Sequence, residues 1–155
     1  RAGQISAIQY SLKAGPLPAA VIDFREIHIP DGASGLSGQQ LLTEILHRCG
    51  IRVFSSPDSG AGVTSFDILC LGEARSEFVL KQGELFTCKA TTDLKILDAH
   101  TREILAAASR QDHAPDISER LAAEEAVRKT VADLAGQLIA PAVEKWRRSA
   151  QGKEK

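Results

Sequence analysis

The chain has 155 residues and a mass of 16.6 kDa; 43% of the residues are hydrophobic and 25% are charged. These values match soluble globular domains, so they exclude a fibrous repeat and a largely disordered chain. The length fits one domain, and no apolar run approaches the roughly 20 residues that cross a bilayer as a helix. A net charge of −1 excludes the broad cationic field that a nucleic-acid backbone attracts.

The sequence begins at Arg1 and contains no methionine. We therefore expect that an upstream piece, such as a targeting sequence, has been removed. Within the given chain we expect an entry segment over residues 1–16, able to form an edge strand. A single α/β domain should follow over residues 17–148, with a frayed tail over residues 149–155.

The cysteines Cys49, Cys70 and Cys88 are odd in number and show no Cys-x-x-Cys or Cys/His spacing. This spacing predicts neither a disulfide framework nor a zinc site. We expect all three to behave as small buried hydrophobic residues. One disulfide with a leftover thiol is the alternative.

The first half of the chain predicts a parallel βαβ unit. Residues 17–24 form a short apolar run that is typical of a buried strand. Breakers over residues 27–37 predict a loop, and Ser37 is a candidate N-cap for a helix that ends before Gly50. The chain then resumes as a strand over residues 51–54, so a right-handed crossover should join two parallel strands.

The second half predicts an antiparallel meander. Apolar and polar residues alternate strictly from Phe86 to Ile96, which is the strongest periodic signal in the chain. A bulge is expected at Gly72, and the hairpin register places Cys70 opposite Leu94 or Lys95. The expected elements are a loop over 55–65, strands over 66–80, 86–96 and 103–109, turns over 81–84 and 98–102, and a loop over 110–116.

A long helix should close the chain. Asp116 or Ser118 can cap it, and an apolar stripe between Leu121 and Leu138 would face the sheet. Pro141 should kink or restart this helix. The predicted fold class is therefore a single α/β domain with a mixed sheet: a βαβ unit, an antiparallel meander and a long C-terminal helix.

The glycines Gly32, Gly35 and Gly38 lie between a predicted strand and a predicted helix. Backbone amides at such a place can cradle a phosphate. The spacing matches neither the P-loop nor the dinucleotide fingerprint. A flexible loop is therefore the competing interpretation.

Catalytic patterns are missing from the sequence. The four histidines are far apart, no His-Glu-x-x-His motif occurs, and no serine has a nucleophile-elbow context. Asp98 and His100 share a turn, where an aspartate commonly bonds the backbone. We expect no catalytic residue, no metal ligand and no cofactor.

Basic residues gather near the C-terminus, at Lys145, Arg147 and Arg148. Cations at a helix end complement the helix dipole, so a solvated helix end is favoured over a lipid or nucleic-acid site. Trp146 is expected to anchor a core or an interface.

Three blocks of the first half have a suggestive order: the strand Ala20–Phe24, the helix that leads into Gly50–Phe54, and the strand Phe66–Ala74. They resemble successive blocks of the bacterial curli-secretion lipoprotein superfamily. That group includes flagellar assembly protein T middle domains and the lipoprotein activators of penicillin-binding proteins.

The block Thr92–Ala106 is similar to that family's strand, turn and strand, with Arg102 where the turn usually has glycine. A terminal amphipathic helix completes the resemblance, which covers Pro18 to Leu138. It implies a mixed α/β domain of the bacterial periplasm that docks onto envelope machinery, and it carries no catalytic residues.

The resemblance leads us to expect a non-enzymatic interaction domain that assists assembly of a cell-envelope structure, in the periplasm or anchored to the outer membrane. Its partner would be a protein rather than a nucleic acid, with a membrane tether through the missing N-terminus and homo-oligomers as a further option. The candidate interaction surface comprises Gly32, Gly35, Gly38 and Trp146. The alternative is a small-ligand or nucleotide-binding module that uses the glycine-rich loop 32–38.

Overall fold

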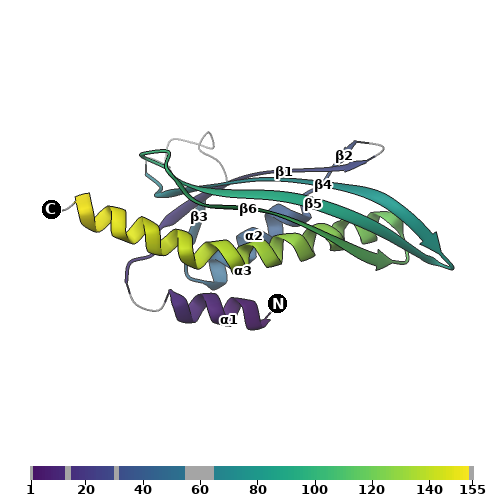
Figure 1. Ribbon diagram of the computed structural model, residues 1–155, viewed down its shortest axis with the longest axis horizontal. Helices are drawn as coiled ribbons and strands as arrows, with labels where there is room; N and C mark the ends of the chain where they lie inside the picture. The colour runs from purple at the N-terminus through teal and green to yellow at the C-terminus, as the bar shows by residue number, and fades with distance from the viewer. Residues whose placement is uncertain (1, 13–14, 30–31, 55–64, 154–155) are drawn as a thin grey trace.

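The computed structural model describes residues 2–12, 15–29, 32–54 and 65–153. The elements are α1 (Ala2–Ser11), β1 (Ala19–Ile29), β2 (Ala33–Ser34), α2 (Ser37–Arg48), β3 (Arg52–Phe54), β4 (Ile68–Gln82), β5 (Leu85–Asp98), β6 (Ile104–Asp116) and α3 (Glu119–Lys153). The strands form one mixed sheet in the order β2-β1-β4-β5-β6, with β3 also paired to β1. All three helices lie on one side of this sheet (Figure 1). The predicted fold class is confirmed.

The βαβ unit is present as β1, α2 and β3. Strand β1 pairs in parallel with β3 on one side and with β4 on the other, so Val21 lies between Phe54 and Leu69. Gly50 ends the turn after α2 with a φ of +83°, a conformation that glycine adopts without steric cost. The predicted C-terminal glycine of this helix is confirmed.

The meander of β4, β5 and β6 is also present, but its β-bulge lies at a different position from the one predicted. The register shifts between Phe78 and Leu80, so the bulge lies at Val79 and the prediction of a bulge at Gly72 is wrong. Gly72 is needed for packing instead, because a Cβ there would overlap the Phe24 ring. Cys70 pairs with Ile96, one position from the predicted register.

Four local predictions are wrong. Residues 27–37 do not form one loop, because β1 continues to Ile29 and Ala33–Ser34 form β2. The first segment forms the helix α1 rather than an edge strand, and residues 110–116 continue β6 rather than forming a loop. Ser37 does not cap α2: the N-cap residue is Leu36, with no side-chain cap bond. Ten of the eleven residues of the predicted loop 55–65 lie outside the described residues.

Helix α3 is a single 35-residue element that continues through Pro141. Ser118 provides its cap, since the Ser118 hydroxyl accepts a hydrogen bond from the Leu121 N–H at 3.1 Å. Leu121 belongs to the predicted apolar stripe but is exposed, whereas Val127 and Leu134 are fully buried. No helix in the described part of the chain is long and apolar enough to span a membrane.

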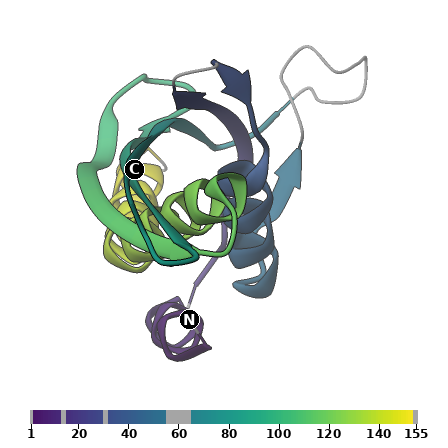
Figure 2. The ribbon, with the colours of Figure 1, turned by 90° about the vertical axis from the view of Figure 1, so that its right-hand side faces the viewer.

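The sheet curls around α3, so the helix lies inside its concave side (Figure 2). Small side chains make this close approach feasible: Ala126 and Ala135 on α3, and Ala74 and Ala90 on the sheet, are fully buried. In the described ranges, no helix lies on the opposite face of the sheet (Figure 1). This uncovered face is called the open face below.

Helix α1 packs beneath α3 through Ile5, Ile8 and Leu12, all of which are buried. The Arg147 guanidinium donates hydrogen bonds to the carbonyls of Leu12 at 3.1 Å and Pro16 at 2.7 Å. One end of α3 therefore fixes the chain segment that follows α1.

Arg102 has a φ of +65° in the turn between β5 and β6, the position where the resembled family has glycine. A non-glycine residue in this region costs roughly 1–2 kcal/mol. We expect Arg102→Gly to raise the free energy of unfolding by about 0.5–1 kcal/mol, measured by urea titration. Glu103→Gly is the matched control and should lower it; a loss of stability in Arg102→Gly would contradict the strain.

Cys49, Cys70 and Cys88 are buried and free, as predicted. Burial raises the pKa of the Cys70 thiol from its ordinary value of 9.0 to about 12. Burial also raises the pKa of Cys49 and, together with the Glu119 carboxylate, that of Cys88.

The Cys70 thiol predicts a loss of stability in alkali. The folded chain keeps this proton while the unfolded chain releases it above pH 9.0, so stability is complete below that pH and falls as pH rises toward about 12. The decline should approach about 1.4 kcal/mol per pH unit. Urea titrations at about pH 8 and about pH 10 should show a steeper decline for the wild type than for Cys70→Ala. Equal slopes would contradict the prediction.

Candidate interaction surface

The loop between β1 and α2 places the three predicted glycines in different surroundings. Gly32 is exposed with a φ of +72°, whereas Gly38 is buried, with no room for a Cβ beside the Phe24 ring. The Gly35 N–H donates to the Glu26 backbone carbonyl at 3.1 Å. Gly32, Ser34 and Leu36 are thus the exposed residues of the described part of this loop, and the loop ends at the buried Ser37 and Gly38.

A carboxylate from β1 already occupies the N-terminus of α2. Glu26 Oε1 accepts a hydrogen bond from the Gly38 N–H at 2.7 Å, and Oε2 accepts one from the Ser37 hydroxyl at 2.6 Å. A negative charge at this position complements the helix dipole and satisfies free N–H groups. A phosphate bound here would have to displace a fully buried side chain of the same chain.

The same carboxylate belongs to an acid, histidine and serine set. His28 Nε2 lies 3.0 Å from Glu26 Oε2 without forming an aligned hydrogen bond, and His28 Nδ1 lies 2.5 Å from the Ser76 hydroxyl oxygen. Such a set could activate a serine nucleophile if substrate could reach it. However, Ser76 exposes 1% of its surface and His28 exposes 6%. The arrangement therefore joins β1, β4 and α2 inside the protein.

Sequence reasoning missed this polar cluster, although one signal was present. Glu26 and His28 are two residues apart on a strand, so their side chains point to the same face. Ser76 joins them because β4 pairs in parallel with β1, with His28 opposite Ser76. Only that pairing brings the serine within reach.

The turn that contains Asp98 and His100, the other candidate catalytic pair, is held by backbone hydrogen bonds. Asp98 accepts backbone hydrogen bonds from His100 at 2.8 Å and Thr101 at 3.0 Å, as expected for an aspartate at a turn. No group of three or more metal-binding side chains occurs among the residues that the structure describes.

The predicted anchor Trp146 is half-buried and packs against the main core. It lies in the C-terminal part of α3, which in Figure 1 is far from β2 and the glycine loop along the long axis. The four predicted surface residues are therefore divided between two regions. The neighbouring Lys145 ammonium contacts the Ile104 carbonyl at 3.2 Å and the Glu103 carboxylate at 3.3 Å.

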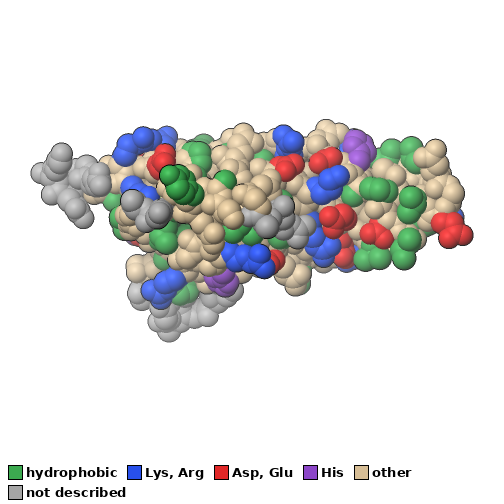
Figure 3. All heavy atoms as spheres, turned by 90° about the horizontal axis from the view of Figure 1, so that it is seen from below, with side chains coloured by type: hydrophobic (Ala, Val, Ile, Leu, Met, Phe, Trp, Pro, Cys, Tyr) green, Lys and Arg blue, Asp and Glu red, His purple; other side chains and the backbone are tan. Residues whose placement is uncertain are grey.

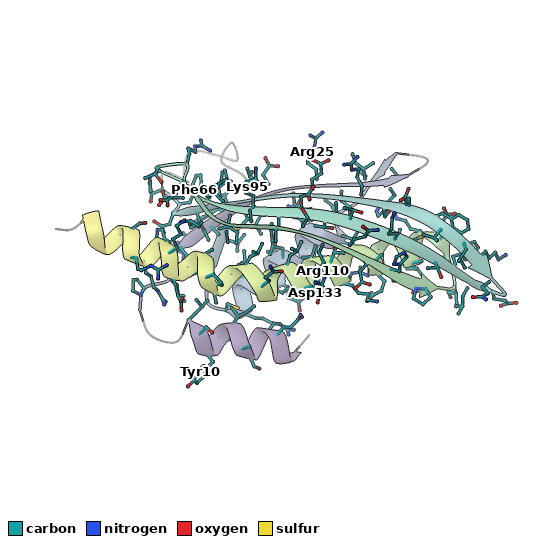
Figure 4. The ribbon with its side chains drawn as sticks, in the orientation of Figure 1. Tyr10, Arg25, Phe66, Lys95, Arg110 and Asp133 are labelled. Atoms are coloured by element: carbon teal, nitrogen blue, oxygen red, sulfur yellow. The ribbon has the colours of Figure 1, made fainter. Side chains whose placement is uncertain are left out.

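The open face offers a continuous surface, with Arg25, Lys95 and Phe66 on the side away from the helices (Figure 4). One end is apolar: the strand registers place Phe54, Val21, Leu69 and Leu97 in a row across the sheet, and the last three of these side chains are buried. These residues form a small hydrophobic cluster with Phe66 and Leu71. Phe54 and Phe66 stay partly exposed.

The next rows become charged. One row runs Asp23, Leu71, Lys95 and Ala107, and the row beyond it runs Arg25, Glu73, Asp93 and Ser109. These two rows line a shallow depression of about 590 Å³.

Glu73 and Asp93 lie directly opposite each other in the second row. Like charges in that position repel, and the Arg75 guanidinium lies 3.9 Å from the Glu73 carboxylate. The Ser109 hydroxyl contacts Asp93, and Arg25 is opposite Glu73 on the neighbouring strand. The open face thus combines an apolar end with a mixed-charge depression, as a surface for a polar partner would.

No family model matches the chain, and no curated protein matches its sequence. Solved structures share its fold. PelC from Paraburkholderia phytofirmans, described as a dodecamer, aligns with a TM-score of 0.53 at 18% identity, over 84% of this chain and 93% of that chain. Protein XCC0632 from Xanthomonas campestris aligns with a TM-score of 0.52 at 9% identity, over 88% of this chain and 89% of that chain. These similarities define a fold found in bacterial proteins.

Proposed function

We propose that the chain is a non-enzymatic protein-interaction domain of the bacterial cell envelope. The observation that carries this proposal is the open face, on which no helix of the described ranges lies and which changes from a largely buried apolar row to exposed charged rows. Its depression and its partly exposed aromatic residues suit a protein partner better than a small molecule, because they form a shallow surface and not an enclosed pocket.

The envelope assignment is supported by the resemblance of Pro18–Leu138 to the curli-secretion lipoprotein superfamily. That resemblance implies a mixed α/β domain, and this is the architecture of the chain. Within the proposal, the domain acts in the periplasm or at the outer membrane and assists assembly of an envelope structure.

A non-enzymatic role is supported by how the reactive side chains are used. Ser76, His28 and Glu26 are buried and bonded to one another or to α2. The buried thiol of Cys70 has a raised pKa, which disfavours the nucleophilic thiolate.

Site-specific photocrosslinking in living cells tests the proposal. The native full-length protein would carry a photoreactive amino acid at Lys95 on the open face, with Glu44 on the exposed side of α2 as the matched control. We expect a specific envelope protein to be captured from the Lys95 position and not from the Glu44 position. A protein found only in the cytoplasm, or equal capture from both positions, would refute the role.

A further inference from the structure

Most strand edges of the sheet are contacted by other parts of the chain, which hinders the addition of a further strand. Strand β1 is covered along its outer edge by β3 and β2. Strand β6 is contacted from α3: the Lys129 ammonium donates to the His113 carbonyl at 2.8 Å, and the Lys145 ammonium donates to the Ile104 carbonyl at 3.2 Å. Pro115 also removes one N–H from β6. Lysine and proline at an edge are common protections against strand addition.

In the described residues, one edge segment has no strand beside it, and its lysine, Lys81, lies with the ammonium 5.0 Å from the Phe86 ring centroid on β5. The pairing of β1 with β4 ends at Ile29 opposite Glu77, while β4 continues to Gln82. In the described ranges, no strand pairs with Val79–Gln82 on the side away from β5. The bulge at Val79 does not prevent β4 from pairing with β5 up to Gln82. This segment therefore presents backbone donors and acceptors to a further strand.

Large hydrophobic side chains surround the same segment, each exposing between 42% and 72% of its surface. They are Phe78, Val79, Leu80, Leu85, Ile117 and Leu121. Ile117 belongs with them because Asp116, its neighbour, pairs with Phe86 next to Leu85. Figure 3 shows hydrophobic side chains gathered at this end of the molecule. We call these six residues the apolar tip.

The size of the apolar tip matches the apolar part of a stable interface. At roughly 200 Å² for a fully exposed large side chain, the six residues expose about 500–600 Å². A standard interface buries about 800 Å² on each partner, of which about 60% is non-polar. Isolated monomers seldom leave a larger apolar patch uncovered.

We propose that the apolar tip joins two copies of this chain, with the Val79–Gln82 segment of each copy paired antiparallel to the same segment of the other. Two identical strand edges can pair with each other in the antiparallel direction. A two-fold axis between the copies then brings the same surface of each copy into the interface. A lipid bilayer fits less well, because it would leave the backbone groups of Val79–Gln82 without partners. The inference rests on the strand edge and stands or fails independently of the envelope role.

Analytical ultracentrifugation of the whole chain tests this pairing. Across about 1 to 100 µM, we expect the wild type to shift from monomer to dimer. Leu80→Lys should weaken the association by at least about tenfold, because it places an ammonium group directly opposite Lys81 of the other copy, where like charges repel. Ile104→Lys is the matched control: Ile104 exposes 49% of its surface against 45% for Leu80, and it lies at the start of β6.

Thermal unfolding followed by circular dichroism should show that both variants stay folded. A wild type that remains monomeric over the whole range would overturn the proposal, and so would equal effects of the two lysine variants. Co-sedimentation of a monomeric wild type with phosphatidylcholine vesicles would also overturn it, by assigning the apolar tip to lipid.

Discussion

Glu26→Ala is expected to lower the free energy of unfolding by about 4 kcal/mol. The substitution leaves the Gly38 N–H and the Ser37 hydroxyl without their acceptor in a buried place, and each unsatisfied donor costs about 1–3 kcal/mol. It also removes the polar contact of Glu26 with His28 and opens a cavity beneath α2. Urea unfolding followed by circular dichroism measures the loss.

Glu26→Gln is the closer variant, since it keeps an acceptor oxygen for one of the two donors, and it should lose about half as much. Glu44→Ala is the control. Its carboxylate forms an exposed pair with Arg48 at 2.8 Å, so its removal should cost less than about 0.5 kcal/mol. A loss below about 1 kcal/mol in Glu26→Ala would show that the buried carboxylate does not hold α2 in place.

Gly72→Ala is expected to cost about 3 kcal/mol, again measured by urea unfolding. The new Cβ would overlap the ring of Phe24, which lies on the neighbouring strand and is buried. The ring has little room to move, because its other side lies close to Gly38, where a Cβ would come within 2.6 Å of it. Overpacking of a rigid core site costs about 1–3 kcal/mol and sometimes more.

A double-mutant cycle tests that explanation. Phe24→Leu makes room at Gly72, so the double variant should be more stable than the sum of the single effects predicts by at least about 1 kcal/mol. Gly136→Ala is the control of opposite sign. Gly136 is exposed on α3 and its Cβ would meet only Gln4, so alanine should stabilise the helix by about 0.5–1 kcal/mol. Strict additivity of Gly72→Ala and Phe24→Leu would contradict the ring clash.

The candidate site was less predictable than the fold. The glycine loop drew attention because the sequence shows its flexibility, but the sequence does not show that Glu26 fills the adjacent helix N-terminus. Similarly, the open face needs the registers of three strands before Arg25, Glu73 and Asp93 become neighbours. Such residues are distant in the sequence, and no local sequence pattern indicates that they will be neighbours in the folded protein.

The sequence by itself determined the local elements whose signals are short-range. Alternation along β5 and the glycine after α2 are consequences of side-chain period and backbone conformation within a few residues. The first helix is a contrary example: α1 has little amphipathic pattern, and it is placed by contacts such as Gln4 with Asp133 on α3, at 3.2 Å.

Tertiary structure decided what covers each surface. Residues 110–116 extend β6 because β5 offers a paired edge for them, although Pro115 alone argues against a strand. Burial of Glu26 with His28, and exposure of Leu121, depend on which elements lie opposite. The physical reason is that strand pairing and helix docking join distant residues through long-range contacts, whereas propensity and periodicity act only along the chain.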